Sequence, residues 1–255
     1  MRDWWRALAE LMLPGECAGC GAPRTVLCEE CRRAVCRGSP RPVRPGSAPD
    51  GLPPVWAAVP YADAVRSVLL AHKERGALPL AAPLGEALAA AVRAALAGAA
   101  PDAAPDAGAD PGALGEAAAR DGPVVLVPVP SARSAVRRRG HDPARRIALA
   151  AAAVLRGAGT PARTAAVLRQ RRAVADQAGL PAAARLANLG GALELRPGGA
   201  HLLPMRGRLL VVDDVTTTGA SVAEAARVLR KAAETKGTPV PFAAAVVAGS
   251  PTFFA

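Results

Sequence analysis

One feature restricts the fold more than any other: the apolar run at residues 209–212 (LLVV) ends directly in Asp213 and Asp214. Four consecutive apolar residues, with no polar residue between them, are typical of a strand that is buried on both faces. A second run of this kind occupies residues 124–129 (VVLVPV). Such strands belong to parallel sheets that helices cover on either side, so we expect an α/β fold with a doubly wound parallel sheet.

Further strands and helices are predicted from the spacing of the apolar residues. Besides the two runs above, we expect strands at 55–61, 164–168 and 240–247, and helices at 64–73, 80–97, 142–156, 181–188 and 219–234. Arg137, Arg138 and Arg139 precede Gly140 and are expected in a loop. Ligands of doubly wound sheets bind beyond the carboxyl ends of the strands, so we expect a site after the two apolar runs.

The composition changes along the chain and suggests three parts. Residues 1–36 combine an apolar helical face, expected to form a short docking helix, with all five cysteines. Residues 37–54 are rich in proline and predict an extended connector. Residues 55–255 would form the α/β domain, interrupted by a low-complexity insertion at residues 98–122.

No membrane span is expected, because the best apolar stretch, at residues 84–100, contains Glu86 and Arg93. The first residues of the chain do not resemble a signal peptide, since charged residues interrupt their apolar character. Both observations predict a cytoplasmic protein.

Four cysteines form two CxxC pairs, which seven residues separate. They are Cys17, Cys20, Cys28 and Cys31. Two such pairs can place four thiolates tetrahedrally around zinc, the closed arrangement of a structural site. Because disulfides are disfavoured in the cytosol, we expect structural Zn²⁺ here. The fifth cysteine, Cys36, is either a free thiol or a substitute ligand.

The positive charge is concentrated in one region. The net charge of the chain is +11, and residues 131–185 alone carry twelve arginines against two aspartates. Such a concentration attracts polyanions, either a phosphorylated small molecule or nucleic acid.

Residues 209–221 (LLVVDDVTTTGAS) combine features that suit a sugar phosphate. The two carboxylates at the strand end can accept hydrogen bonds from a vicinal diol. The backbone N–H groups and hydroxyls of the following loop, with the positive end of a helix, suit a phosphate dianion. The loop consists of Val215, Thr216, Thr217, Thr218, Gly219, Ala220 and Ser221. A diol beside a phosphate is the outline of a ribose 5-phosphate.

This segment resembles the phosphoribosyl pyrophosphate signature of type I phosphoribosyltransferases. The wider series of motifs resembles the ComF family, which is associated with competence and DNA uptake. In order, the series is LPGECAGCG…LCEEC, VPYADAVRSVLLAHKERG, VPVP…RRRGHDPARRIA, LRQRRAVADQAGLPAAARLANLGGAL and the signature itself.

The resemblance implies a type I phosphoribosyltransferase-like sheet with a small N-terminal zinc knuckle, and it implies roles for individual residues. Asp213 and Asp214 would hold the ribose hydroxyls, and residues 216–221 would wrap the 5-phosphate. Lys73 would belong to the pyrophosphate loop, and Arg139 would lie in a flexible basic loop that closes over pyrophosphate. These cations and Mg²⁺ would neutralise the leaving group.

The chain departs from the related patterns at two places. Purine-salvage enzymes carry an acidic residue at the position of Thr217, so purine salvage loses support here. His141, Asp142 and Pro143 stand where many relatives have an aromatic residue and Asn-Gln, and we expect His141 to be an exposed loop residue. Gln177, Arg185 and Asn188 match recurrent positions of the family, without an assigned role.

Three hypotheses of function follow. The first is a phosphoribosyltransferase that binds Mg²⁺–phosphoribosyl pyrophosphate and transfers phosphoribose to an unknown acceptor. The second is a non-catalytic factor of DNA uptake with single-stranded DNA or DNA-uptake proteins as partners, which the zinc knuckle and the basic region favour. Aromatic residues that could stack on single strands are scarce, however, at 3% of the chain. The third is a regulator that senses the metabolite.

Overall fold

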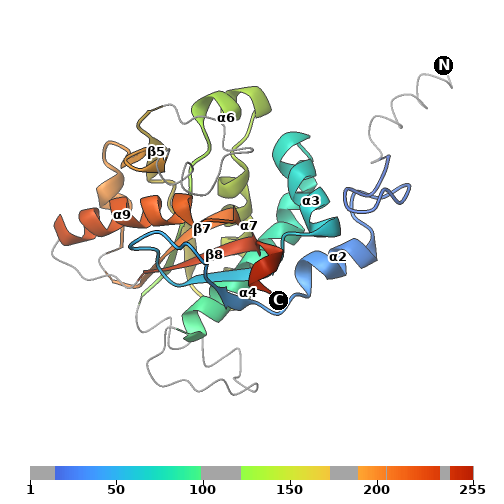
Figure 1. Ribbon diagram of the computed structural model, residues 1–255, viewed down its shortest axis with the longest axis horizontal. Coiled ribbons are helices and arrows are strands. Elements are labelled where there is room, and N and C mark those ends of the chain that lie inside the picture. Colours follow the sequence, from blue (N-terminus) through green and yellow to red (C-terminus); the bar gives the residue numbers. More distant parts are fainter. Residues whose placement is uncertain (1–14, 99–121, 173–188, 205, 236–241, 255) are drawn as a thin grey trace.

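The computed structural model describes residues 15–98, 122–172, 189–204, 206–235 and 242–254 (Figure 1). The expected docking helix at the N-terminus, the helix at residues 181–188 and nearly all of the low-complexity insertion lie outside these residues. Gln177, Arg185 and Asn188 lie outside them as well.

The described chain alternates between strands and helices. The strands are β1 (Arg41–Val43), β2 (Val55–Pro60), β3 (Val124–Pro128), β4 (Ala162–Thr164), β5 (Leu168–Gln170), β6 (Leu193–Leu195), β7 (Arg208–Thr216) and β8 (Phe242–Gly249). The helices are α2 (Glu29–Cys36), α3 (Asp63–Glu74), α4 (Ala81–Gly98), α6 (Arg133–Arg139), α7 (Pro143–Gly157) and α9 (Ala220–Thr235). Three short 3₁₀ helices are η1 (Leu78–Leu80), η2 (Gly199–Leu202) and η3 (Pro251–Phe253).

Six strands form the central sheet in the order β1-β2-β8-β7-β3-β4. Neighbours from β2 to β4 run parallel, and β1 at the edge runs antiparallel to β2, with Arg41 opposite Ala57. The strands β5 and β6 pair as a separate antiparallel ribbon. The prediction of an α/β fold with a mostly parallel sheet is therefore confirmed. The proline-rich segment predicted as a connector differs from expectation, because it supplies the edge strand β1.

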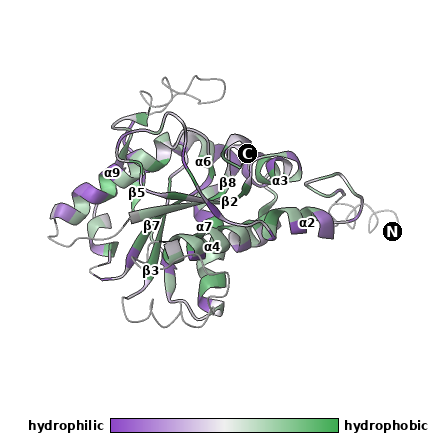
Figure 2. Cartoon of the chain, turned by 60° about the horizontal axis from the view of Figure 1, so that its bottom comes forward, coloured by the Kyte–Doolittle hydropathy of each residue, from purple (hydrophilic) through white to green (hydrophobic). Residues whose placement is uncertain are grey.

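Helices cover both faces of this sheet (Figure 1). The side chains of β7 alternate between the faces: Leu210 and Val212 pack in one core with α4 and α7, and Leu209 and Val211 pack in the other with α9. This alternation is the two-residue period of a strand. Figure 2 shows hydrophobic residues along β3 and hydrophilic residues at the outer end of α9. The uninterrupted apolar runs are thus explained by burial on both faces.

The segment Leu78–Gly98, which contains α4, is long and apolar enough to cross a membrane by length and composition. In the structure, 61% of its most apolar window is buried, and α4 packs against α7, β2 and β8. A core helix of an α/β domain has the same composition, and this packing accounts for its apolar character.

The strands β3 and β7 lie side by side, but the chain leaves them in opposite directions. After β3 it forms α6 and α7 and continues to β4; after β7 it forms α9 and continues to β8 on the other side. The carboxyl ends of β3 and β7 therefore border a topological switch point, where ligands of such sheets bind. The strand β7 is longer than expected and includes Asp213 and Asp214.

Two local predictions were wrong. Arg137–Arg139 do not lie in a loop but form the last turn of α6, and Gly140, with a φ of 76°, ends this helix in the left-handed conformation. The single strand expected at 164–168 is two strands, because Thr164 ends β4 and Leu168 begins β5. Between them the chain leaves the central sheet for the ribbon.

The close packing of α4 on α7 depends on Gly85, and this generates a first prediction. A Cβ at Gly85 would clash with the side chain of Ala150 and would lie 2.9 Å from its carbonyl carbon. Gly85→Ala should therefore lower the free energy of unfolding by about 1–3 kcal/mol, measured by urea denaturation. Gly157, at the end of α7, has no atom within 4 Å of such a Cβ, so Gly157→Ala is the control. Equal stability of the two variants would contradict the close contact.

Candidate functional site

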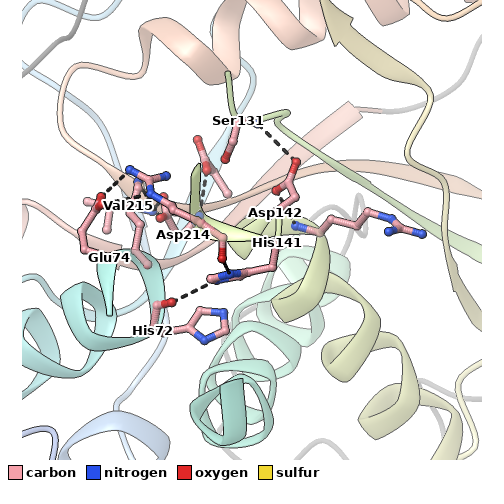
Figure 3. A network of polar contacts seen from close by, with 11 residues as sticks. His72, Glu74, Ser131, His141, Asp142, Asp214 and Val215 are labelled. Atoms are coloured by element: carbon pink, nitrogen blue, oxygen red, sulfur yellow. Dashed lines mark hydrogen bonds and ion pairs between the residues drawn. The ribbon is translucent and has the colours of Figure 1, made fainter. Parts of the chain in front are cut away.

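The carboxyl end of β7 carries the two acidic residues that the sequence singled out. Asp213 is partly buried and Asp214 is buried. The backbone N–H of Asp214 donates to Oδ1 of Asp213 at 2.8 Å, and the N–H of Val215 donates to Oδ1 of Asp214 at 2.9 Å. These bonds fix both carboxylates at the switch point of the sheet, and Figure 3 shows Asp214 beside Val215.

Lys73 reaches this pair from the last turn of α3. Its Nζ donates to Oδ2 of Asp214 at 2.7 Å, although 141 residues separate the two in sequence. Burial alone would raise the pKa of Asp214, but the ammonium of Lys73 outweighs it and holds that pKa below its ordinary value. Asp214 in turn raises the pKa of Lys73. Both groups are therefore charged at neutral pH.

Asp213 lies in a different environment from its neighbour. Burial and the negative charge of Asp214 raise the pKa of the Asp213 carboxyl well above its ordinary value. Within the described part of the chain, no cation makes a direct ion pair with it. Two carboxylates thus share one lysine, and the site can accept either a further cation or hydroxyl groups that donate hydrogen bonds.

The segment after the carboxylates forms the expected turn from strand to helix. Thr216 is buried at the end of β7, and its hydroxyl has no partner among the described residues. The Oγ1 of Thr218 accepts from the N–H of Ala220 at 3.4 Å, where α9 begins. Gly219 has a φ of +75°, and a Cβ there would lie 2.9 Å from Leu52 Cδ2, so the turn requires glycine. Thr217 is exposed, and Ser221 lies in the first turn of α9.

The end of α3 also binds the basic helix α6 through contacts that the sequence did not suggest. The carboxylate of Glu74 accepts two hydrogen bonds from Arg139, from Nε at 2.9 Å and from Nη2 at 2.5 Å. Nε2 of His141 lies 3.0 Å from the carbonyl oxygen of His72, and its Nδ1 lies 3.2 Å from that of Arg139. Figure 3 shows His72, Glu74 and His141 around Asp214.

The prediction of an exposed His141 was therefore wrong, because only 7% of this residue is exposed. It follows α6 and is covered by the end of α3, where its ring lies 5.4 Å from that of His72. The next residue, Asp142, caps α7 by accepting from the N–H of Arg145 at 3.2 Å, and it accepts from the N–H of Ser131 at 3.3 Å. These bonds fix the chain after β3 beside the carboxylates.

Sequence reasoning named Lys73 and Arg139 but missed their neighbours. The structure brings Lys73 to the carboxylate pair, and it brings Arg139 close enough to Lys73 to oppose the rise in the pKa of that lysine. The omitted residues are Glu74 and His141. Glu74 and Arg139 are 65 residues apart, so no local signal in the sequence pointed to their ion pair.

A second cluster lies in the N-terminal part. The sulfur atoms of Cys17, Cys20, Cys28 and Cys31 all lie within 4.8 Å of one another, and these cysteines form no disulfide. Cys20 Sγ and Cys28 Sγ are 3.6 Å apart, close to the roughly 3.8 Å between ligands of a tetrahedral zinc–thiolate centre. The four cysteines can therefore hold a metal ion such as zinc.

The protonation of Cys17 and the position of Cys36 fit this cluster. The N–H groups of Cys28 and Gly19 donate to the sulfur of Cys17 at 3.3 and 3.4 Å. Burial would raise the pKa of this thiol, but the hydrogen bonds outweigh burial and lower the pKa to about 6. Cys36 lies outside the cluster and donates to the carbonyl oxygen of Pro83 at 3.5 Å. Among the two readings of Cys36, the structure thus favours a free thiol.

The cysteine-containing segment packs on the α/β domain. Val35 in α2 is fully buried in the core that contains α4. In the same helix, Nη2 of Arg32 donates to both carboxylate oxygens of Glu86 in α4, at 2.6 and 2.8 Å. Gly19 lies against Cys31 and Ala64, the second residue of α3. The cysteine-containing segment before residue 36 therefore packs continuously against the α/β domain.

No protein-family model matches the chain, and no curated protein matches its sequence.

The carboxylate pair predicts opposite effects of two similar substitutions. The low pKa of Asp214 stabilises the fold above about pH 4, and this contribution is lost as the pH falls through the folded-state pKa. The raised pKa of Asp213 has the opposite sign: stability is lost as the pH rises from about 4 through its folded-state pKa. Asp213→Asn should therefore raise the melting temperature at pH 7 and leave it nearly unchanged below about pH 4.

Asp214→Asn should instead lower stability at pH 7, because Lys73 loses its partner. The loss should be about 1–3 kcal/mol, below that of a fully buried pair, since 37% of the Lys73 side chain is exposed. Urea denaturation from pH 3 to pH 8 measures both variants. Destabilisation by Asp213→Asn at pH 7 would contradict the assignment of Lys73 to Asp214.

The cysteine cluster predicts that one zinc ion binds and stabilises the fold. Cys31→Ser should abolish stoichiometric zinc, measured by elemental analysis, and lower the melting temperature by roughly 10 °C. Cys36→Ser is the matched control and should retain zinc, because Cys36 lies outside the cluster. A Cys31→Ser protein with one tightly bound zinc would rule out the four-cysteine centre.

Proposed function

We propose that the chain is a ComF-type, phosphoribosyltransferase-like protein that binds Mg²⁺–phosphoribosyl pyrophosphate and transfers phosphoribose to an acceptor. One observation carries the proposal: Asp213 and Asp214 are adjacent at the carboxyl end of β7, where Lys73 pairs with Asp214, directly before a Thr/Gly turn into α9. This arrangement stands at the switch point of the parallel sheet, where such folds bind ligands.

The carboxylates suit the ribose part of the ligand. The hydroxyls of a vicinal diol donate two hydrogen bonds to acceptors that lie side by side, as Asp213 and Asp214 do. The raised pKa of Asp213 strengthens this preference, because hydrogen-bond donors or a cation would offset the burial and the repulsion from Asp214 that disfavour its charged form. Asp213 is thus the residue that would hold Mg²⁺ or a ribose hydroxyl.

The turn after β7 suits the 5-phosphate. The first N–H groups of α9 lack partners within the helix and, with the helix dipole, favour an anion. The hydroxyl of Thr216 is buried without a partner among the described residues. The hydroxyls of Thr217 and Ser221 belong to the same turn. Because Gly219 has no side chain, the backbone can approach a phosphate closely.

The cations at the end of α3 suit pyrophosphate as a leaving group. In the transfer, the bond from the ribose C1 to the pyrophosphate oxygen breaks, and the acceptor forms a bond to C1. Negative charge then develops on pyrophosphate, which Lys73 and Arg139 are positioned to stabilise. Bound Mg²⁺ would supply further neutralisation of the same oxygens.

The exposed arginines support a second candidate, a non-catalytic nucleic-acid-binding or coupling factor in DNA uptake. On α6 and the first turn of α7, the exposed arginines are Arg133, Arg137, Arg138, Arg145 and Arg146. Such a surface suits the phosphate backbone of a single strand, and it requires no turnover at the carboxylates.

Calorimetric titration with phosphoribosyl pyrophosphate, with and without Mg²⁺, tests the first proposal. We expect saturable binding that requires Mg²⁺ and that Asp213→Asn/Asp214→Asn weakens at least about 100-fold, since both diol acceptors lose charge. Glu86→Gln/Glu194→Gln is the matched control, because it removes two carboxylates of partly exposed ion pairs elsewhere. A folded protein that does not bind the ligand would overturn the proposal.

The same variants separate the two candidates. If single-stranded DNA is the ligand, Arg137→Glu/Arg138→Glu should lower its affinity and reduce the dependence on salt. The Asp213/Asp214 variant should then bind DNA as the wild type does. If phosphoribosyl pyrophosphate is the ligand, the Asp variant fails and the Arg variant retains binding.

A further inference from the structure

The proposed function leaves one contact at the site unexplained, the ion pair between Glu74 and Arg139. Glu74 occupies Nε and Nη2 of Arg139, which form one edge of the guanidinium. This edge is the one with which arginine binds carboxylates and phosphates through two parallel hydrogen bonds. A phosphate group can therefore use this edge only after Glu74 has left it.

We propose that Glu74 is an internal counter-anion for Arg139, a latch that a diphosphate ligand displaces when it binds. The inference rests on the proposed function, because it assigns a regulating residue to the same site. Glu74 would neither touch the reacting atoms nor hold the ligand. It would set the affinity for the pyrophosphate part by competing for one arginine.

The two members of the pair differ in exposure, and this difference favours displacement. The Arg139 side chain is 13% exposed, whereas that of Glu74 is 43% exposed. Release of Glu74 would return an already partly hydrated carboxylate to water, which costs little free energy. Asp214 is the opposite case, because its side chain is 7% exposed and its release from Lys73 would leave a buried charge unpaired.

The backbone around Arg139 is held independently of Glu74. Nε2 of His141 lies 3.0 Å from the carbonyl oxygen of His72, and the residue is buried against α3. The end of α6 therefore stays beside α3 when Glu74 is released. Only the guanidinium has to turn from the carboxylate to the ligand, so the exchange needs no movement of a helix.

Inorganic pyrophosphate is the probe for the test, titrated by calorimetry into the full chain with zinc. Glu74→Gln removes the competing charge but keeps the size of the side chain. It should bind pyrophosphate roughly 3- to 10-fold more tightly than the wild type. In an Arg139→Gln background, the same substitution should produce no gain, since the two residues act through one pair.

Arg32 and Glu86 provide a matched control. Their pair also consists of two hydrogen bonds between one guanidinium and one carboxylate, and Glu86 is exposed to a similar extent as Glu74. It joins α2 to α4, however, rather than α3 to α6. Glu86→Gln should leave the affinity for pyrophosphate unchanged. A similar gain from both variants would indicate a general effect of net charge and would overturn the latch.

A second readout needs no ligand. Phenylglyoxal modifies accessible arginines, and mass spectrometry reports the rate at each site. Glu74→Gln should speed the modification of Arg139 and not of Arg32, Glu86→Gln should do the reverse, and pyrophosphate should protect Arg139. An unchanged rate at Arg139 in Glu74→Gln, or weaker pyrophosphate binding by this variant, would overturn the proposal.

The outcomes also separate the latch from the proposed function. If Mg²⁺–phosphoribosyl pyrophosphate binds through the carboxylates but Glu74→Gln does not tighten pyrophosphate binding, the latch alone is wrong. If no variant binds either ligand, both proposals are wrong, and the pair between Glu74 and Arg139 is structural.

Discussion

The ion pair between Lys73 and Asp214 is the contact on which the geometry of the site depends. It joins the end of α3 to the end of β7 across 141 residues of sequence, and it is largely buried on the side of the aspartate. Because Lys73 pairs with Asp214, the Asp213 carboxyl lies beside a like charge and has no ion pair of its own among the described residues, which raises its pKa. A protein that kept this arrangement for stability alone would be more stable with a neutral residue there. The unequal pairing of the two carboxylates is what the proposed ligand site would require.

Helix α3 is positioned at both of its ends. Its first turn lies beside Gly19 of the cysteine cluster, and its last residues contact β7 and α6. The helix α2, which follows the cluster, is in turn fixed to α4 by Val35 and by the pair of Arg32 with Glu86. A metal in the cluster would therefore stabilise the support of Lys73 as well as its own loop, although the two sites share no ligand.

The local features of the site could be predicted from sequence, because they depend on neighbours along the chain. The apolar run before Asp213 and Asp214 and the glycine after the threonines determine a strand, a turn and a helix. The spacing of the cysteines likewise brings four sulfur atoms together. The contacts of Glu74 and the burial of His141 could not be read in this way, since they arise where α3 meets α6 in the folded chain. The helix α6, in contrast, could have been predicted from the sequence, because Arg133–Arg139 are mostly good helix formers and Gly140 is a typical helix end.

The positive charge of this chain is divided between cations that are paired at the site and arginines that are exposed. Lys73 and Arg139, the two cations assigned to the site, are each bound to an acidic residue, while the arginines at the surface of α6 remain exposed. The exposed arginines attract any polyanion over a distance set by the ionic strength. Under the proposed function, the inner cations would respond only to a ligand that outcompetes a carboxylate for the same donors. In this proposal, the exposed arginines attract polyanions in general, whereas Lys73 and Arg139 select among them. The affinity of the inner site then depends on how far the hydrogen bonds of the ligand exceed, in free energy, the internal ion pairs that it must break.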